Sequence, residues 1–297
     1  MWRRFSRLLA AGPGTLKAAI VAAGALLLAA PMAPTDASGA WQLVWADEFD
    51  SDGELSSADW SYEHGFVRNR ELQWYQCENA FVENGMLVIE GRHETIRNSN
   101  HDPSSNDWRE SRKFARYTSA SVNTKGRHDW RYGRFEVRAR IRAEDGLWPA
   151  IWFLGVDGGW PSNGEIDLME YYAGDILANA AWGRPARSGG KPVWNATRTP
   201  VGSFGPDWAN EFHTWRMDWD ESSIELYVDD RLLNTIDVGA TVNPPGVLPQ
   251  YPFRQPHYLL LNLAIGGQGG NPEGTAFPTR YEIDYVRVYQ RSWTGLR

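Results

Sequence analysis

The sequence predicts an all-β fold, either a sandwich or a barrel of short strands. Runs of β-branched and aromatic residues recur from Trp41 onward, and turns rich in Gly, Pro, Asn and Asp separate them. No segment shows the 3.6-residue apolar period of a long helix. No repeat and no linker-like change of composition interrupts residues 41–291, so we expect a single domain over 41–297.

Individual strands follow from the alternation of side chains. Residues 133–142 alternate apolar and charged positions, which predicts a strand with one buried face and one wet face. Residues 150–154 are apolar on both faces and predict a central strand. Further strands are predicted at 86–90, 212–219, 223–228, 257–265 and 283–289, with a hairpin at Asp229–Asp230. The polar stretches 92–114, 184–210 and 239–256 are interpreted as surface loops.

Composition limits the classes of function. The 297 residues contain one cysteine, so an intrachain disulfide is excluded, and the net charge of −7 argues against nucleic acid as a partner. The 16 Trp are an unusually high number. Most aromatic side chains pack in cores, but a flat indole face also binds sugar rings. A neutral, hydroxyl-rich ligand is therefore indicated.

The first 40 residues have the pattern of an export signal. Basic residues precede an apolar run over 18–30, which small residues and Pro follow up to Ala40. The run is short and rich in Ala for a transmembrane helix. We expect residues 1–40 to be a signal peptide with a short linker, and the mature protein to be secreted or periplasmic with no membrane contact. An uncleaved anchor is the alternative.

Three carboxylates lie within six residues, Glu165, Asp167 and Glu170, in a segment that otherwise resembles a buried strand. Glu165 and Asp167 share one face of a regular strand, but Glu170 would point the other way. One β-bulge, most simply at Met169, would put all three on one face. A cluster of acids is costly through desolvation and repulsion, so it is tolerated mainly where the chemistry uses it.

This pattern is typical of a two-carboxylate glycosidase. Glu165 would be the nucleophile, Glu170 the general acid and then the base, and Asp167 would tune its neighbours. The Cα separation of about 13 Å along the strand must shrink to carboxyl groups about 5 Å apart, which requires a strongly curved sheet with the acids on its concave side. A solvated acidic face and a calcium site are the alternatives.

The segments around the cluster resemble glycoside hydrolase family 16, in particular its bulged-strand, laminarinase-like branch. The resemblance lies in residues 146–155, 160–164 and 165–170, and also in 43–50, 69–75, 132–136, 262–267 and 284–289, so it covers nearly all of 41–290. It implies a β-jelly-roll sandwich of two curved antiparallel sheets with a concave cleft. It also implies retaining endo-cleavage of a β-linked glucan or galactan, with no cofactor for catalysis and the three acids in the roles given above.

The resemblance further implies binding residues. Asn69, Trp148, Trp152 and Trp160 match positions that line the glycone subsites of the family. Trp182 stands near the place of a His that faces the cleft in typical laminarinases, where it could be a stacking platform or a core residue. This departure puts β-1,3-glucan specificity in doubt.

Family members often carry a structural Ca²⁺ on the convex side of the sandwich. Here its ligands would be Glu48, a backbone carbonyl near Glu83, and Asp284. Ordinary turn capping is the alternative role for Glu48 and Asp284.

The leading hypothesis is a secreted, monomeric, retaining endo-glycosidase that cleaves a laminarin-type β-1,3-glucan. The first alternative is an endo-β-galactosidase acting on galactan or on host O-glycan or keratan-type chains. A non-catalytic glucan-binding protein is a third hypothesis, although such sensors typically lose the acids and this chain keeps all three.

Overall fold

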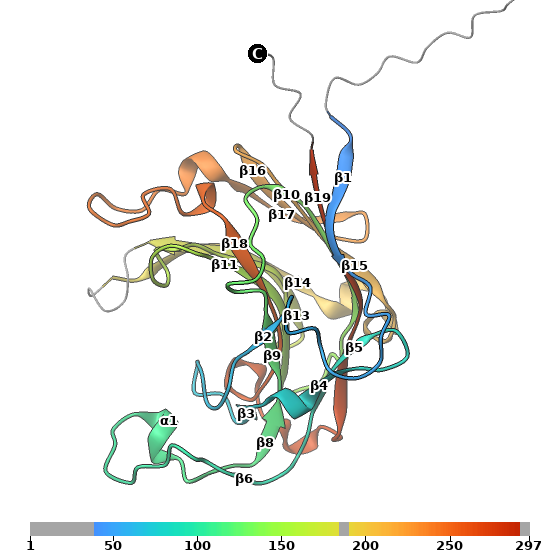
Figure 1. Ribbon diagram of the computed structural model, residues 1–297, viewed down its shortest axis with the longest axis vertical. Helices are drawn as coiled ribbons and strands as arrows, with labels where there is room; N and C mark the ends of the chain where they lie inside the picture. The colour runs from blue at the N-terminus through green and yellow to red at the C-terminus, as the bar shows by residue number, and fades with distance from the viewer. Residues whose placement is uncertain (1–38, 184–189, 292–297) are drawn as a thin grey trace, which may run out of the picture. The chain divides into compact units, whose positions relative to one another are not determined.

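Two antiparallel sheets form the body of the unit Ser38–Arg297 in the computed structural model, which describes residues 39–183 and 190–291. Figure 1 shows them packed against each other. The eight-stranded sheet has the order β17 (Arg231–Asp237), β16 (Ser223–Val228), β15 (His213–Trp219), β10 (Gly133–Arg140), β19 (Thr279–Arg291), β5 (Leu87–Gly91) and β4 (Ala80–Val82), and β1 (Trp41–Asp47) also pairs with β19. The seven-stranded sheet has the order β14 (Pro192–Pro200), β13 (Asp175–Gly183), β12 (Glu165–Tyr172), β11 (Leu147–Gly155), β18 (His257–Ile265), β9 (Ser121–Asn123) and β2 (Ser61–Tyr62).

The remaining elements are short. Strands β3 (Gln73–Tyr75) and β8 (Tyr117–Ser119) form a parallel pair, and β6 (Ile96–Arg97) pairs with β7 (Phe114–Ala115). The α-helix α1 (Trp108–Ser111) begins where the side chain of Asp107 accepts a hydrogen bond from the backbone N–H of Arg109. The 3₁₀ turns span Cys77–Asn79, Val201–Phe204, Trp208–Asn210, Val238–Ala240, Pro252–Arg254, Gly267–Gly269 and Pro272–Gly274. Among the described residues no helix is long and apolar enough to cross a membrane.

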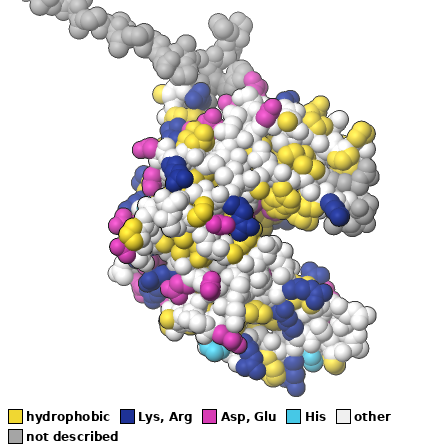
Figure 2. All heavy atoms as spheres, turned by 180° about the vertical axis from the view of Figure 1, so that it is seen from behind, with side chains coloured by type: hydrophobic (Ala, Val, Ile, Leu, Met, Phe, Trp, Pro, Cys, Tyr) yellow, Lys and Arg dark blue, Asp and Glu magenta, His cyan; other side chains and the backbone are white. Residues whose placement is uncertain are grey.

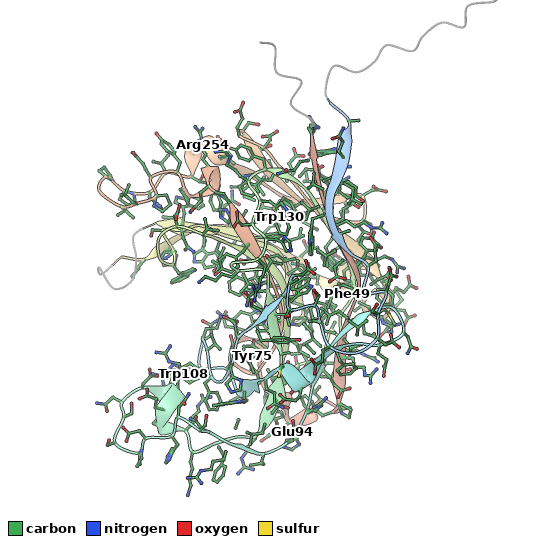
Figure 3. All side chains as sticks on the ribbon, in the orientation of Figure 1. Phe49, Tyr75, Glu94, Trp108, Trp130 and Arg254 are labelled. Carbon is green, nitrogen blue, oxygen red and sulfur yellow. The ribbon has the colours of Figure 1, made fainter. Side chains whose placement is uncertain are left out.

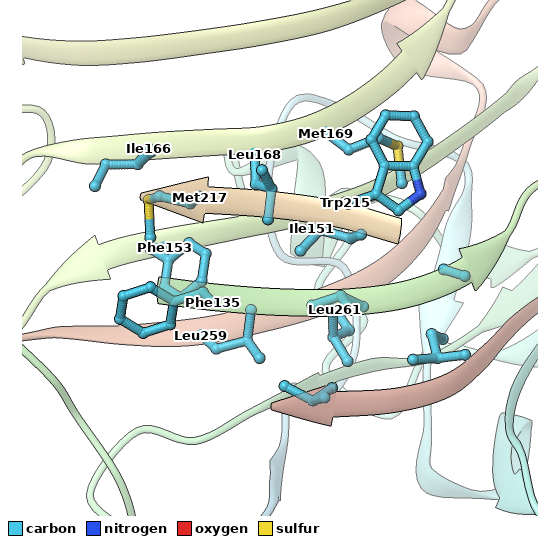
Figure 4. Packing of buried hydrophobic residues seen from close by; sticks show 14 of the residues in the cluster. Phe135, Ile151, Phe153, Ile166, Leu168, Met169, Trp215, Met217, Leu259 and Leu261 are labelled. Carbon is cyan, nitrogen blue, oxygen red and sulfur yellow. The ribbon is translucent and has the colours of Figure 1, made fainter. Parts of the chain in front are cut away.

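The main core lies between the two large sheets. Figure 4 shows side chains of β11, β12 and β18 facing those of β10 and β15. On β10 every second residue is buried, and on the central β18 every residue is buried. Both patterns follow from strand geometry, because alternate side chains point to opposite faces and a central strand is covered on both. The predicted all-β sandwich is confirmed, as are the strands at 133–142, 150–154 and 257–265.

One side of this unit is deeply notched, as Figure 2 shows. In Figure 1 the notch opens between the segment that carries α1 and the ends of β11 and β14. Tyr75 and Trp108, labelled in Figure 3, mark this α1 side. The segment 184–210, predicted to be a loop, contains the edge strand β14, so that prediction is wrong in part. The predicted signal peptide lies outside the described residues.

Candidate active site

A β-bulge in β12 sets the direction of the three carboxylates. In the ladder with β11, Met169 pairs with Ile151 and Asp167 pairs with Trp152, so Leu168 is the extra residue. Leu168 and Met169 are both fully buried and both belong to the core between the sheets (Figure 4). Two successive side chains therefore point inward, and Glu170 returns to the face of Glu165 and Asp167. A bulge between Asp167 and Glu170 is confirmed, but its unpaired residue is Leu168 and not Met169 as predicted.

Indole N–H groups hold both glutamates. Nε1 of Trp148 donates to Oε1 of Glu170 at 2.8 Å, and Nε1 of Trp160 donates to Oε2 of Glu165 at 2.8 Å. The side-chain amide of Asn179 on β13 also donates to Glu170, at 3.2 Å. Donors of this kind stabilise the ionised carboxylate and fix its orientation. Trp148 and Trp160 were predicted from the sequence as substrate-binding residues, not as donors to the glutamates. Asn179 was missed, although it is a polar residue in an otherwise apolar strand.

All three acids hold their protons more tightly than free carboxyl groups. Burial, then the charge of Glu170, raises the pKa of Glu165 to about 8, against the indole of Trp160 and the charge of Arg68. Burial raises the pKa of Glu170 to about 7, against its hydrogen bonds from Trp148 and Asn179. Burial and the two glutamates raise the pKa of Asp167 well above its usual range. The cluster therefore retains protons at neutral pH.

The loop before β3 places opposite charges near the two glutamates. The charge of Arg68 lowers the pKa of Glu165, whereas the charge of Glu71 raises the pKa of Glu170. Arg68 lies over the ring of Trp152, with 5.0 Å between its Cζ and the ring centroid, and it pairs with Glu63. The loop thus favours an anion at Glu165 and a proton at Glu170. The burial of Glu71 depends on long-range packing, so the sequence did not reveal it.

Two predicted binding residues lie in a hydrogen-bonded network around Glu71. Its carboxylate accepts from Asn69 at 3.2 Å and from Tyr75 at 3.4 Å. The amide of Asn262 donates to the Tyr75 hydroxyl and its oxygen accepts from Nε1 of Trp152, at 3.1 and 2.7 Å. Asn69 is exposed and has a φ of 54°, which suits a turn. Trp152 is only 8% exposed because Arg68 lies over its ring, so it offers little surface on which a sugar could stack.

Trp182 does not face the carboxylates. On β13, Asn179 and Ala181 pair with Asp167 and Glu165 and share their face. Trp182 points the opposite way, packs on the main core and meets Phe253 edge-on with ring centroids 6.3 Å apart. The hypothesis that it is a stacking platform is not supported, and the alternative that it is a core residue fits its contacts. Because side chains alternate along a strand and Asn179 faces the carboxylates, Trp182, three residues later, faces the core.

A different tryptophan occupies the carboxylate face. Trp194 on β14 pairs with Ala181, which in turn pairs with Glu165, so the three side chains share one face. Trp194 is 45% exposed. Because β14 is polar, the sequence did not predict this strand, and so it did not predict which face Trp194 lies on.

The two acidic side chains predicted to bind calcium, Glu48 and Asp284, are each paired with an arginine. Glu48 forms two hydrogen bonds with Arg287, of 2.7 and 2.8 Å, and Asp284 pairs with Arg138. The carboxylate of Glu83, near which a backbone carbonyl was predicted as the third ligand, pairs with Arg280. No group of three or more His, Cys, Asp or Glu side chains in the described part of the chain is placed to hold a metal. A cation would have to displace guanidinium groups that already neutralise these acids, so the residues present do not fit the predicted Ca²⁺ site.

Comparison with known proteins agrees with this geometry. The model of the family Glycosyl hydrolases family 16 matches residues 89–287. A beta-glucanase of Rhodothermus marinus is 35% identical over 273 residues, covering 86% of this chain and 87% of that protein.

Two solved structures of endo-acting glycosidases resemble this chain. One comes from work on endo-acting O-glycanases of the human gut microbiota, with a TM-score of 0.76, 36% identity, and 85% and 91% of the two chains covered. The other is the catalytic domain of a laminarinase from Thermotoga petrophila, with a TM-score of 0.68, 36% identity, and 86% and 99% covered. The chain therefore belongs to glycosyl hydrolase family 16 and is an endo-acting glycoside hydrolase.

Proposed function

We propose that the enzyme cleaves internal β-linkages with retention of configuration, with Glu165 as nucleophile and Glu170 as acid and base. The observation that carries this proposal is the bulge at Leu168, which turns both glutamates to one face of β12. Retaining glycosidases need two carboxyl groups on either side of the scissile bond, close enough for one of them to reach the anomeric carbon.

In the first step Glu170 gives its proton to the glycosidic oxygen while a carboxylate oxygen of Glu165 bonds to the anomeric carbon, and the bond to the leaving sugar breaks. Its pKa of about 7 lets Glu170 hold a proton near neutrality, and the indole of Trp148 stabilises the anion that remains. In the second step Glu170 takes a proton from water, whose oxygen bonds to the anomeric carbon and releases Glu165.

In the free enzyme burial raises the pKa of both glutamates, so their pKa values do not by themselves assign the two roles. The roles therefore rest on strand geometry and on the placement of Arg68 and Glu71. When substrate binds, the positive charge that develops at the anomeric carbon favours an anion at the adjacent Glu165.

Asp167 is proposed to remain protonated between the two glutamates. It is 2% exposed, and its Oδ2 has no hydrogen-bond acceptor or donor among the described residues. A neutral acid there keeps a third negative charge out of the cluster, which would otherwise raise the pKa of Glu165 further.

For the substrate we propose a laminarin-type β-1,3-glucan. We propose that the enzyme loses its signal peptide on export and cleaves the glucan outside the cytoplasm, as a monomer and without a cofactor. The Rhodothermus and Thermotoga relatives are a beta-glucanase and a laminarinase, which supports this choice. The second candidate is an endo-β-galactosidase on O-glycan or keratan-type chains. The higher TM-score of the O-glycanase structure, 0.76 against 0.68, favours that candidate.

The test combines variants with product analysis. Glu165→Gln and Glu170→Gln should each nearly abolish hydrolysis while binding of the polymer remains, and substantial activity in either variant would refute the roles. Laminarin, mixed-linkage glucan, agarose and keratan-type chains should be compared as substrates. Proton NMR of the first product should show the β-anomer before mutarotation, and an initial α-anomer would exclude retention.

A further inference from the structure

Exposed tryptophan is rare in this protein despite the high content of this residue. Among the described residues only Trp160 and Trp194 are exposed, at 43% and 45%. Trp160 donates its indole N–H to Glu165 and so belongs to the catalytic centre. Trp194 makes no contact of that kind, and nothing in the proposed reaction uses it.

The register of the sheet places Trp194 on the same face as the three carboxylates. Trp194, Ala181 and Glu165 are paired across β14, β13 and β12 and form one row on one face. Neighbouring strands lie about 4.8 Å apart, so the side chains of Trp194 and Glu165 originate about 10 Å from each other. Because Glu165, Ala181 and Trp194 share one face, the same surface continues from the proposed nucleophile to the indole.

Among the described residues, the neighbours of Trp194 on this face of the sheet have small side chains and leave its indole uncovered. Ala181 lies beside it in the row, and Ala196 is the next residue of β14 that points the same way. Arg198, further along that face, is held by Asp175 at 2.9 Å and lies over Tyr172. The indole and the small side chains next to it form a flat apolar surface at the edge of the sheet. The glutamates provide polar groups on the same face of the sheet.

We propose that Trp194 is a stacking platform for a pyranose ring of the bound polysaccharide, outside the ring that Glu165 attacks. This inference rests on the proposed function, because it needs a chain long enough to extend across β13 and β14. The apolar C–H face of a β-linked pyranose is the group that a free indole face binds, and a flat ring needs no charged partner there. Trp194 is therefore a specificity-determining residue for chain length.

The test compares Trp194→Ala, Trp194→Phe and Val193→Ala. Val193 is the matched control, because it is the adjacent residue of the same strand, is 49% exposed and points to the opposite face. The kinetic constants kcat and KM should be measured on laminarin, on laminari-oligosaccharides of increasing length and on an aryl glycoside with one sugar. Trp194→Ala should lower kcat/KM on laminarin about tenfold, mainly through KM.

The pattern across variants and substrates decides the inference. The Trp194→Ala variant should keep wild-type activity on the aryl glycoside, Trp194→Phe should keep most activity on laminarin, and Val193→Ala should match the wild type. An unchanged KM of Trp194→Ala on laminarin, or an equal loss on the aryl glycoside, would overturn the platform. If the wild-type enzyme cleaves laminarin and one of these results is obtained, only the proposed role of Trp194 is refuted. If the wild-type enzyme cleaves no polysaccharide, the proposed function itself is refuted.

Discussion

Replacing Trp148 by Phe removes one hydrogen-bond donor from the proposed acid and little else. Trp148 is 7% exposed, donates to Oε1 of Glu170 at 2.8 Å, and packs edge-on against Tyr172 with ring centroids 5.3 Å apart. A phenyl ring keeps the aromatic contact but has no N–H. The variant therefore isolates the effect of the donor on the pKa of Glu170.

The magnitude follows from the strength of the bond. A hydrogen bond to a charged group contributes about 1.5 to 3 kcal/mol, and we take about 1.5 kcal/mol because Glu170 is only partly buried. One pKa unit corresponds to about 1.4 kcal/mol. The donor stabilises the anion, so its loss should raise the pKa of Glu170 from about 7 by about one unit.

The assay is kcat/KM against pH, which reports groups of the free enzyme. Because Glu170 must be protonated to act as the acid, the alkaline limb of the profile should move to higher pH by about one unit. Trp152→Phe is the matched control, because Trp152 is 8% exposed on the same strand and donates to Asn262 instead. A limb that stays in place or moves to lower pH, or an equal shift in the control, would refute this role of Trp148.

Three further predictions concern the bulge, a tightly packed glycine and the calcium ligands. Deleting Leu168 should straighten β12, turn Glu170 toward the core and abolish hydrolysis of any polymer; an active deletion variant would contradict the role of the bulge. Gly155→Ala should lower the free energy of unfolding by about 2 to 3 kcal/mol in denaturant titrations, because a Cβ there would lie 2.0 Å from the carbonyl oxygen of Asn163, and an unchanged midpoint would contradict it. EDTA and excess Ca²⁺ should both leave Tm unchanged, because Arg287 already pairs with Glu48, and a rise of several degrees with Ca²⁺ would show a site.

The catalytic strand could be predicted from the sequence because its signal is local. The spacing of Glu165, Asp167 and Glu170 requires a parity change, and the apolar Leu168 and Met169 between them are the residues that a bulge can turn inward together. The strand β10 could also be predicted from the sequence, since its apolar and charged residues alternate without a break.

Features that depend on partners far away in the chain could not be predicted. The pairing of Glu48 with Arg287 joins residues 239 positions apart, and it replaces an expected cation by a guanidinium group. Arg68 lies over the ring of Trp152, so this indole, which was predicted to bind substrate, is covered by a residue far away in the chain. Trp194 was missed for a different reason, because a polar edge strand lacks the apolar alternation that marks a strand.

The most direct measurement is to trap the glycosyl-enzyme with a 2-deoxy-2-fluoro glycoside of the accepted substrate and to map the modified residue by peptide mass spectrometry. The account predicts a covalent ester on Glu165 in the wild-type enzyme and none in Glu165→Gln. An ester on Glu170 or Asp167, or inversion with no adduct, would contradict it.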